Sequence, residues 1–570
     1  MHFLRGLSIL SLACATTFAA GADVRLPDIG SSAAAIMSPQ ELREYGLGLL
    51  QQLRAYDLVL EDPLVADYVN SLGYRLVASS GRDDSVFTFV ALRDPGINAF
   101  AAPGGLIGIN AGLLTAMRSE QELAGVVAHE IAHVQQQHIL RAFEDQKKMS
   151  IPIMLGMLGV MIAASGRTDD AAAAAMITGT SLMQQRQIDF TRSEEAEADR
   201  IGIQTLARAG YDPGAMAGAF SALQKVMRVN GIDVPEFLRS HPLDTRRIAE
   251  ARARAAQLGC PEAPRLAARP APAPVGPLDL QLRPSTPTAA QAIDAAAAQR
   301  ASDTATATVA SAADEAGTLP PVAVNACVTH TQGEPYFELI RERVRVQMAT
   351  SPATIRAYYA DNLRDDRTFD TLANRYGFAL ALVRAGDPGA AIREFDALVQ
   401  RDPDSSVLRL ALATAKDQAG DRVGARAVFD RLQDDFPGNR AVTLGHAQSL
   451  LGHGDAASAR RALELLRPLL ERRPGDPDLQ RSFGRASDLA GDKVRAAEAY
   501  AEAAWLGGHA EDALNQLKAL VKQPDLTYYQ RSRIDARITQ LTPAVLELRK
   551  RSDPAAPDSL APAFGCCRVR

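Results

Sequence analysis

Two histidines four residues apart, with a glutamate between them, are the residues of this sequence best suited to catalysis. They lie in GVVAHEIAHVQQQHI, residues 125–139, which holds three of the nine histidines in the 570-residue chain. On a helix, residues i and i+4 share one face, so His129 and His133 can grip one ion. Glu130 projects about 100° round the helix, close enough to reach a water there. This spacing is typical of a zinc peptidase, in which the ion polarises the scissile carbonyl and activates water while the glutamate moves the proton.

A catalytic zinc needs at least one more protein ligand, and the neighbouring residues do not supply an obvious one. Gln136 and Ile139 stand where one class of zinc peptidase requires Gly and His, so that class is excluded. His138 is five residues from His133 and points off the shared face of a continuous helix. We therefore expect His138 to be a polar surface residue or a partner of a ligand, and not a ligand itself.

An acidic stretch downstream, TRSEEAEADRIGI, offers carboxylates at helical spacing. Glu195 and Asp199 are four residues apart and share a face. One carboxylate can bind zinc while the other accepts the free N–H of a ligating histidine and fixes its tautomer. Glu194 and Glu197 fit an acidic first helical turn favoured by the helix dipole.

The combination His129-Glu130-x-x-His133 followed by Glu195-x-x-Ala198-Asp199 resembles the M48 family of zinc metallopeptidases. The upstream segment NAFAAPGGLIGINAGLL, residues 98–114, is similar to the strand and loop that precede the zinc helix in that family. The resemblance implies one Zn²⁺ per chain, with Glu195 as the third ligand and Asp199 as the carboxylate partner of a ligand.

The same resemblance draws attention to SHPLDTRRIAEARARA. In close relatives a His-Pro motif here supplies a fourth ligand in a closed resting site, and His241 occupies the matching place. A fourth side chain on a catalytic zinc would silence the enzyme until it moved away. Arg247 matches a residue that steadies the oxyanion in relatives. From the residues alone, the alternative for His241 is a loop histidine held extended by the following proline, which we favour less. Arg247 is about equally a solvated helix residue.

Three segments of the N-terminal half must position these side chains. Ser119 and Glu122 form a capping box, and helix formers follow to about Glu144. The stretch FTFVALRDPGINAFAAPGGLIGI alternates like a strand and predicts a small sheet, whose edge can hold an extended substrate. The apolar stretch 151–165 is too short to span a bilayer. It fits either a core helix over the active site or, as we favour, a mobile lid that touches membrane or unfolded substrate.

The C-terminal half repeats with a period of 34 residues. Gly-Asp pairs recur at Gly386, Gly420 and Gly454, with a fourth 37 residues later at Gly491, and each is followed by an alanine and then a large side chain. This pattern resembles the tetratricopeptide repeat (TPR), whose helix pairs stack into a curved solenoid. The family uses the concave groove to bind peptides or partner proteins.

Composition divides the chain further. Arg5, the apolar run GLSILSLACATTFAA and Ala20-Gly21-Ala22 predict a cleavable signal peptide over 1–22 and export of the mature protein. The family resemblance implies that its destination is the periplasm. We place an M48-type domain at 36–255, an Ala/Pro-rich linker at 256–333, the TPR-type solenoid at 334–545 and a tail at 546–570. The predicted fold is mainly α, with a zincin-like α+β protease domain before the solenoid. Four cysteines remain after cleavage (Cys260, Cys327, Cys566 and Cys567), and their pairing or freedom is left open.

Two classes of function fit these features. The first is a zinc endopeptidase, and the family resemblance implies that it works in the periplasm, in quality control of outer-membrane β-barrel assembly, and degrades misassembled proteins. The resemblance implies chaperone activity beside it, and repeats that dock on the assembly machinery. The second is a chaperone or scaffold in which zinc is structural. A net charge of −5 gives no support to nucleic-acid binding. Glu130 has no role in a purely structural site, so we favour the enzyme.

Overall fold

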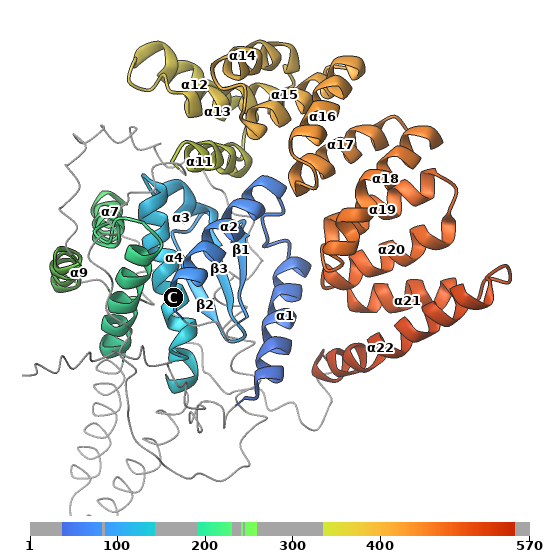
Figure 1. The fold of residues 1–570 in the computed structure, drawn as a ribbon, viewed down its shortest axis with the longest axis horizontal. Coiled ribbons are helices and arrows are strands. Elements are labelled where there is room, and N and C mark those ends of the chain that lie inside the picture. The colour runs from blue at the N-terminus through green and yellow to red at the C-terminus, as the bar shows by residue number, and fades with distance from the viewer. Residues whose placement is uncertain are drawn as a thin grey trace, which may run out of the picture.

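The protein is described here from a computed structural model, shown in Figure 1, that covers residues 37–81, 86–142, 191–230, 241–242, 245–258 and 334–552. The predicted signal peptide, the 151–165 stretch, nearly all of the linker and most of the tail lie outside the described residues. So do all four remaining cysteines. None of the helices in the described part of the chain combines the length and apolarity that crossing a membrane requires.

A three-stranded sheet lies at the centre of the N-terminal half (Figure 1). It consists of β1 (Thr88–Leu92), β3 (Leu106–Asn110) and β2 (Ala99–Ala102), in that spatial order. β1 runs parallel to β3, and β2 runs antiparallel to it with Phe100 opposite Gly108. A side chain at Gly108 would collide with that ring, because an added Cβ would lie 2.4 Å from it. The predicted small sheet is confirmed.

Helices pack round this sheet. α2 (Pro63–Ser79) packs on β1, and α4 (Glu120–Gln135) packs on β2, while α1 (Pro39–Ala55) and α3 (Ala111–Ala116) complete the first part. A helix over residues 191–208, α7 (Ala215–Asn230) and α9 (Thr245–Gln257) follow. α4 begins with the predicted N-cap, where Ser119 Oγ accepts from Glu122 N at 3.2 Å. Nearly every side chain of α4 is buried, so this helix is the core element of the N-terminal half.

α4 is shorter than its sequence predicts. It ends at Gln135, with Gln136 as its C-cap, and Gln137 adopts a positive φ of 55°. Residues 138–142 are helical again. The expectation that one helix continues to about Glu144 is therefore wrong. The three consecutive glutamines are good helix formers, so their propensity gives no sign of the break.

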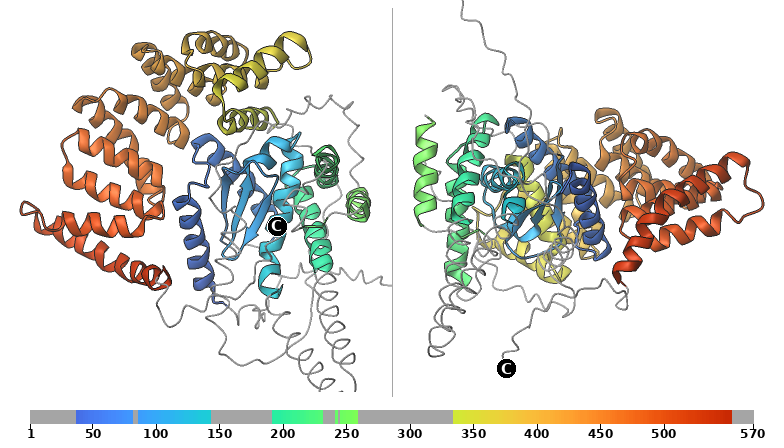
Figure 2. Two further views of the ribbon diagram at one scale, coloured as in Figure 1. Left: turned by 180° about the vertical axis from the view of Figure 1, so that it is seen from behind. Right: turned by 90° about the horizontal axis from the view of Figure 1, so that it is seen from below.

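The described part of the C-terminal half, residues 334–552, is built from helices alone. The left view of Figure 2 shows these helices as an arc that runs over the top and down one side of the N-terminal half. The Gly-Asp pairs mark its turns: each glycine has a positive φ, and each aspartate caps the next helix. α18 has 17 residues where α14, α16 and α20 have 14, which explains the single 37-residue step. The helices are α11 (Glu334–Met348), α12 (Pro352–Asp365), α13 (Leu372–Arg384), α14 (Pro388–Arg401), α15 (Ser406–Gln418), α16 (Arg422–Asp435), α17 (Arg440–Gly452), α18 (Ala456–Arg472), α19 (Pro477–Leu489), α20 (Lys493–Leu506), α21 (Ala510–Leu520) and α22 (Tyr528–Ser552).

The two halves share one core through α11. Its apolar side chains, among them Phe337 and Ile340, pack in the same buried cluster as the protease residues Tyr68 and Leu72. Asp62 caps α2 and also forms an ion pair with Arg343 of α11 at 2.7 Å, with both side chains largely buried. In sequence, α11 is thus the first helix of the repeat half. In the structure, it packs as part of the core of the N-terminal half.

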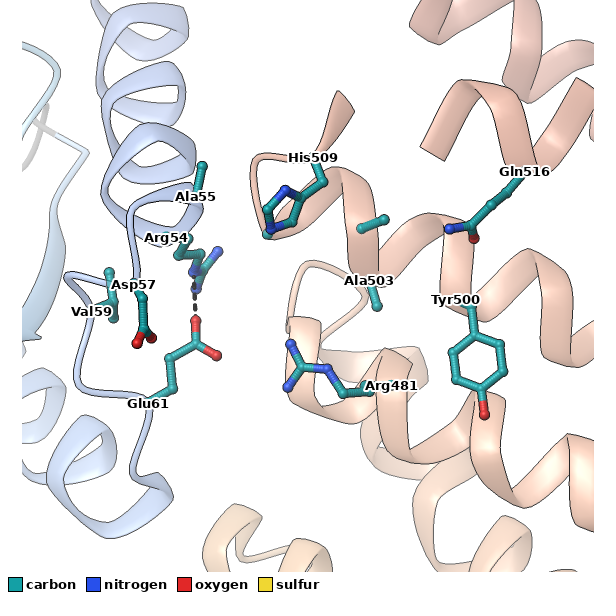
Figure 3. A pocket seen from close by; sticks show the side chains of 12 residues that line it. Arg54, Ala55, Asp57, Val59, Glu61, Arg481, Tyr500, Ala503, His509 and Gln516 are labelled. Carbon is teal, nitrogen blue, oxygen red and sulfur yellow. Dashed lines mark ion pairs between the residues drawn. The ribbon is translucent and has the colours of Figure 1, made fainter. Parts of the chain in front are cut away.

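Farther along the arc, the halves are separated by a hollow of about 750 Å³ between the end of α1 and helices α19–α21 (Figure 3). The N-terminal half lines one side of the hollow with Arg54 and Glu61, which pair at 3.1 Å. The repeat half lines the other side with Arg481, Tyr500 and His509. Beside it, Gln51 and Arg54 donate to backbone carbonyls at the end of α20. The contact between the halves at this place is therefore mainly polar.

Candidate metal centre

Four of the predicted site residues converge in the protease half. His129 and His133 on α4, Glu195 on the 191–208 helix and His241 before α9 each offer one ligand atom, and these atoms all lie within 4.8 Å of one another. All four side chains are buried. Three segments distant in sequence thus bring three imidazoles and one carboxylate to one point.

The contacts within this cluster suit a bound cation. His129 Nε2 lies 3.0 Å from His133 Nε2 and 3.3 Å from His241 Nδ1, while His241 Nδ1 lies 2.8 Å from Glu195 Oε1. Ring nitrogens that face one another cannot all carry protons, and a shared cation would satisfy their lone pairs together. A set of nitrogen and carboxylate donors is typical of zinc sites. The residues present therefore fit the metal that the sequence predicts.

Asp199 holds the far side of the His129 ring. Its Oδ1 lies 3.0 Å from His129 Nδ1, which leaves Nε2 directed at the cluster. Burial would lower the pKa of His129, but its hydrogen bonds to the carboxylates of Asp199 and Glu195 outweigh burial and raise the pKa to about 10. A cation that binds Nε2 must therefore displace a proton from this ring.

His133 lies in the opposite electrostatic setting. Burial lowers the pKa of His133 to about 3, so this ring is neutral at any physiological pH and ready to act as a ligand. Burial would raise the pKa of Glu195, yet His241 and His129 hold it well below its usual range. Glu195 is accordingly an anion in the cluster.

His138 is not on the surface, which was one of its two predicted placements. Its side chain is only 2% exposed. Its Nδ1 lies 2.9 Å from Nδ1 of His133, so it takes the other predicted placement, as a partner of a ligand. Its Nε2 lies 3.2 Å from Glu197, which also accepts from Arg141 at 3.0 Å. Glu197 thus has specific partners beyond a general role in an acidic turn.

Arg247 ties the carboxylates of the site together. Its guanidinium donates to both oxygens of Asp199, at 2.9 and 2.8 Å, and pairs with Glu195 at 2.7 Å. It also donates to the carbonyl of Pro242 at 2.9 Å and lies over the ring of Phe220. These contacts place Arg247 beside the cluster; its predicted action on the oxyanion stays a prediction.

Glu130 is the remaining predicted residue. It is 1% exposed, and no group in the described part of the chain forms a hydrogen bond with either of its carboxylate oxygens. His241 Nε2 lies 3.6 Å from one of them. A buried carboxylate without hydrogen bonds is costly to fold, and such groups mark functional sites.

Sequence reasoning did not identify Glu197 and Arg141 as members of this site. A sequence signal for His138 existed in its spacing, since a histidine just past a zinc motif can contact a ligand if the helix breaks. The break at Gln137 carries neither glycine nor proline, so the spacing alone could not show it.

Comparisons with known proteins agree with this geometry. The model of peptidase family M48 matches residues 63–255, and that of the tetratricopeptide repeat matches residues 382–448. A β-barrel assembly-enhancing protease of Escherichia coli K12 is 40% identical over 246 residues, which cover 43% of this chain and 50% of that protein. A β-barrel assembly-enhancing protease of Yersinia pestis is 40% identical over 235 residues, 41% of this chain and 48% of that protein. A mitochondrial metalloendopeptidase of Schizosaccharomyces pombe is 28% identical over 181 residues, 32% of this chain and half of that protein. The chain thus spans about half the length of the curated relatives it matches.

Proposed function

We propose that this chain, which carries an M48 peptidase domain followed by tetratricopeptide repeats, is a zinc-dependent endopeptidase of the periplasm. Its proposed substrates are unfolded or misassembled outer-membrane β-barrel proteins, in line with the names of its bacterial relatives. The observation that carries the enzymatic part is Glu130, a buried carboxylate that forms no hydrogen bond with any described residue and lies beside four converging ligand side chains.

The roles of the side chains follow from their positions. His129, His133 and Glu195 would hold one zinc ion, which when bound acts as a Lewis acid on the scissile carbonyl and the attacking water. Asp199 fixes the His129 ring through Nδ1. Glu130 would take a proton from the attacking water and deliver it to the leaving amine. Arg247 keeps Glu195 and Asp199 in place, and its further role at the oxyanion is part of this proposal.

The closure by His241 supports a resting state. His241 reaches both Glu195 and His129 and lies against Glu130, so it fills the side of the cluster where a substrate carbonyl would enter. In this arrangement the cluster offers four protein ligands, one more than a typical catalytic zinc site. We propose that the enzyme is self-inhibited until His241 moves away.

Replacing Glu130 with Gln tests the enzymatic role. Glu130→Gln keeps the shape of the side chain and touches no proposed ligand atom, so zinc content should equal that of the wild type. Turnover of an unfolded β-barrel protein should fall by at least about 100-fold, the effect expected from losing a general base. If turnover is unchanged in a variant that still holds zinc, the proposed protease activity is refuted.

A second candidate function is favoured by the four-ligand geometry itself. A fully ligated zinc is typical of structural sites, and in that case the chain would act as a chaperone or scaffold. The two functions separate on one measurement: a scaffold suppresses aggregation of the unfolded β-barrel protein equally well in the wild type and in Glu130→Gln, and cleaves in neither.

His241→Ala tests self-inhibition. Removing the fourth ligand should raise turnover several-fold while zinc stays bound by His129, His133 and Glu195. The matched control is His509→Ala, a histidine on the wall of the hollow in Figure 3, far from the cluster, which should leave turnover unchanged. A fall in activity in His241→Ala, with zinc retained, would contradict the inhibitory role.

The repeats are the proposed docking site for assembly machinery. Helices α18–α22 enclose a hollow of about 810 Å³, lined by apolar residues such as Phe483 and Leu517 and by two ion pairs, Arg533 with Glu498 and Arg537 with Glu502. Mixed apolar and charged linings suit a polypeptide segment. The 151–165 stretch, proposed to contact membrane or unfolded substrate, lies outside the described residues.

A further inference from the structure

We propose that His138 is a positioning residue for the metal centre: it holds the His133 ring in the one orientation and tautomer that present Nε2 to the ion. The proposal rests on the proposed metal site and extends it to a residue outside the ligand set. Three contacts carry it, from His133 to His138, from His138 to Glu197, and from Glu197 to Arg141.

The first contact fixes the direction of the protons. His133 Nε2 belongs to the cluster, so a neutral His133 must carry its proton on Nδ1. That N–H faces His138 Nδ1 at 2.9 Å, and His138 Nδ1 must therefore be the acceptor. The proton of a neutral His138 then lies on Nε2, which donates to Glu197 Oε2 at 3.2 Å. Each group in the chain has one donor facing one acceptor.

The far end of the chain is anchored on a second helix. Glu197 accepts from His138 and from Arg141 and lies between Glu195 and Asp199 on the 191–208 helix. The helix that supplies the third ligand therefore also holds, through His138, a ligand of α4. Asp199 does the same for His129 directly. Both histidines of the motif thus have their outer nitrogens fixed by this one helix, one by a carboxylate and the other through an inserted imidazole.

The backbone explains how His138 reaches His133. On a continuous helix, residue i+5 lies well off the face of residue i. The positive φ of Gln137 ends α4 and turns the next helical residues, so the His138 ring comes to 4.8 Å from the His133 ring, centre to centre. An L residue with positive φ carries a conformational cost, and such strain persists where the surrounding structure depends on it.

The test is zinc affinity, measured on the full chain by competition with a chromogenic chelator. His138→Leu removes the acceptor and should weaken zinc binding about 10- to 100-fold, the usual effect of losing such an outer partner. His138→Asn places Oδ1 where the imidazole has Nδ1, so it should restore affinity close to that of the wild type. The absorption spectrum of the Co²⁺-substituted protein should change in His138→Leu and return in His138→Asn.

Two controls make the result specific. His446→Leu removes another buried histidine, in α17, and should leave zinc affinity and the Co²⁺ spectrum unchanged. Glu197→Ala keeps the His138 ring but removes the carboxylate that holds it, and should cause a smaller loss of zinc affinity. If His138→Leu does not fold, Glu197→Ala and His138→Asn together carry the test. Equal zinc affinity in the wild type and His138→Leu, or equal losses in the Leu and Asn variants, would overturn the inference. Failure of the wild type to bind zinc would overturn the proposed metal site instead.

Discussion

His129 and His133 face the same point with the same ring atom, yet their outer nitrogens have different partners. Asp199 is an anion and favours a charged His129 ring, while His138 is neutral and leaves burial to keep His133 uncharged. Without metal, the His129 ring is thus protonated and the His133 ring neutral. A cation that binds here replaces a proton on the His129 ring, whereas the His133 ring already offers a free lone pair.

Zinc uptake should therefore release a proton throughout the neutral range. Because the pKa of His129 is raised to about 10, zinc competes with a proton at every lower pH, and apparent affinity should rise about tenfold per pH unit. The slope of zinc affinity against pH is measured by competition with a chelator, in roughly one-unit steps between about pH 6 and pH 9. Asp199→Asn should flatten the slope and lower affinity. A slope of zero in the wild type would contradict the assignment.

The same proton affects stability in the metal-free chain. A raised pKa means that the folded state binds the proton more tightly than the unfolded state does. The stabilisation by charged His129 is fully present below its ordinary pKa of 6.5 and is lost as the pH rises toward about 10. Bound zinc removes this loss between pH 6.5 and about 10, because the folded state then has no proton on the ring nitrogen that faces the ion.

At the scale of elements, the break between α4 and residues 138–142 decides where His138 points. Gln137 has the φ of 55° that glycine adopts at little cost, whereas Gln136 has an ordinary helical backbone. Replacement by glycine should therefore affect stability differently at these two adjacent glutamines.

Gln137→Gly should keep the turn and relieve about 1 kcal/mol of left-handed strain, partly offset by the entropy of glycine in the unfolded chain. Gln136→Gly, the matched control, should destabilise by about 0.5–1 kcal/mol. Thermal unfolding of the two metal-free variants measures both. If Gln137→Gly were the less stable of the pair, the backbone at this break would not be as described.

The motifs and periodicities of the sequence predict much of this fold and site. The small sheet, the helix that begins after Ser119, the repeat architecture and the four residues of the cluster all follow from local pattern or from the resemblance to family M48. Two features do not. The break at Gln137 goes with the contact of His138 with Glu197, and the place of α11 depends on contacts with α2 and α3, all far away in sequence.

At the scale of the molecule, the buried Asp62–Arg343 pair joins the halves. Burial would raise the pKa of Asp62, but Arg343 outweighs it and holds the pKa below 3.8. A lowered pKa gives stability that is present above about pH 4 and lost as the pH falls further. Above about pH 4 the pair therefore stays charged and links α11 to the start of α2.

Arg343→Met should destabilise the chain by about 3–5 kcal/mol, because it leaves Asp62 buried without its charged partner. Adding Asp62→Asn should recover part of that loss. Arg473→Ala removes a half-exposed partner of Asp67, 3.6 Å away, and should cost less than about 1 kcal/mol. Urea unfolding of the four proteins, wild type included, compares them. Equal effects of the Arg343 and Arg473 changes would show that the buried pair does not join the halves.

The position of α11 in the protease core also sets an order of events in biosynthesis. α9 ends at Gln257 and α11 begins at Glu334, so a ribosome must translate the whole intervening segment before the first repeat helix of that core exists. Until then, Tyr68 lacks its contact with Phe337 of α11. The N-terminal half therefore stays incomplete throughout its own synthesis, and its core closes only when the repeat arm has begun to emerge.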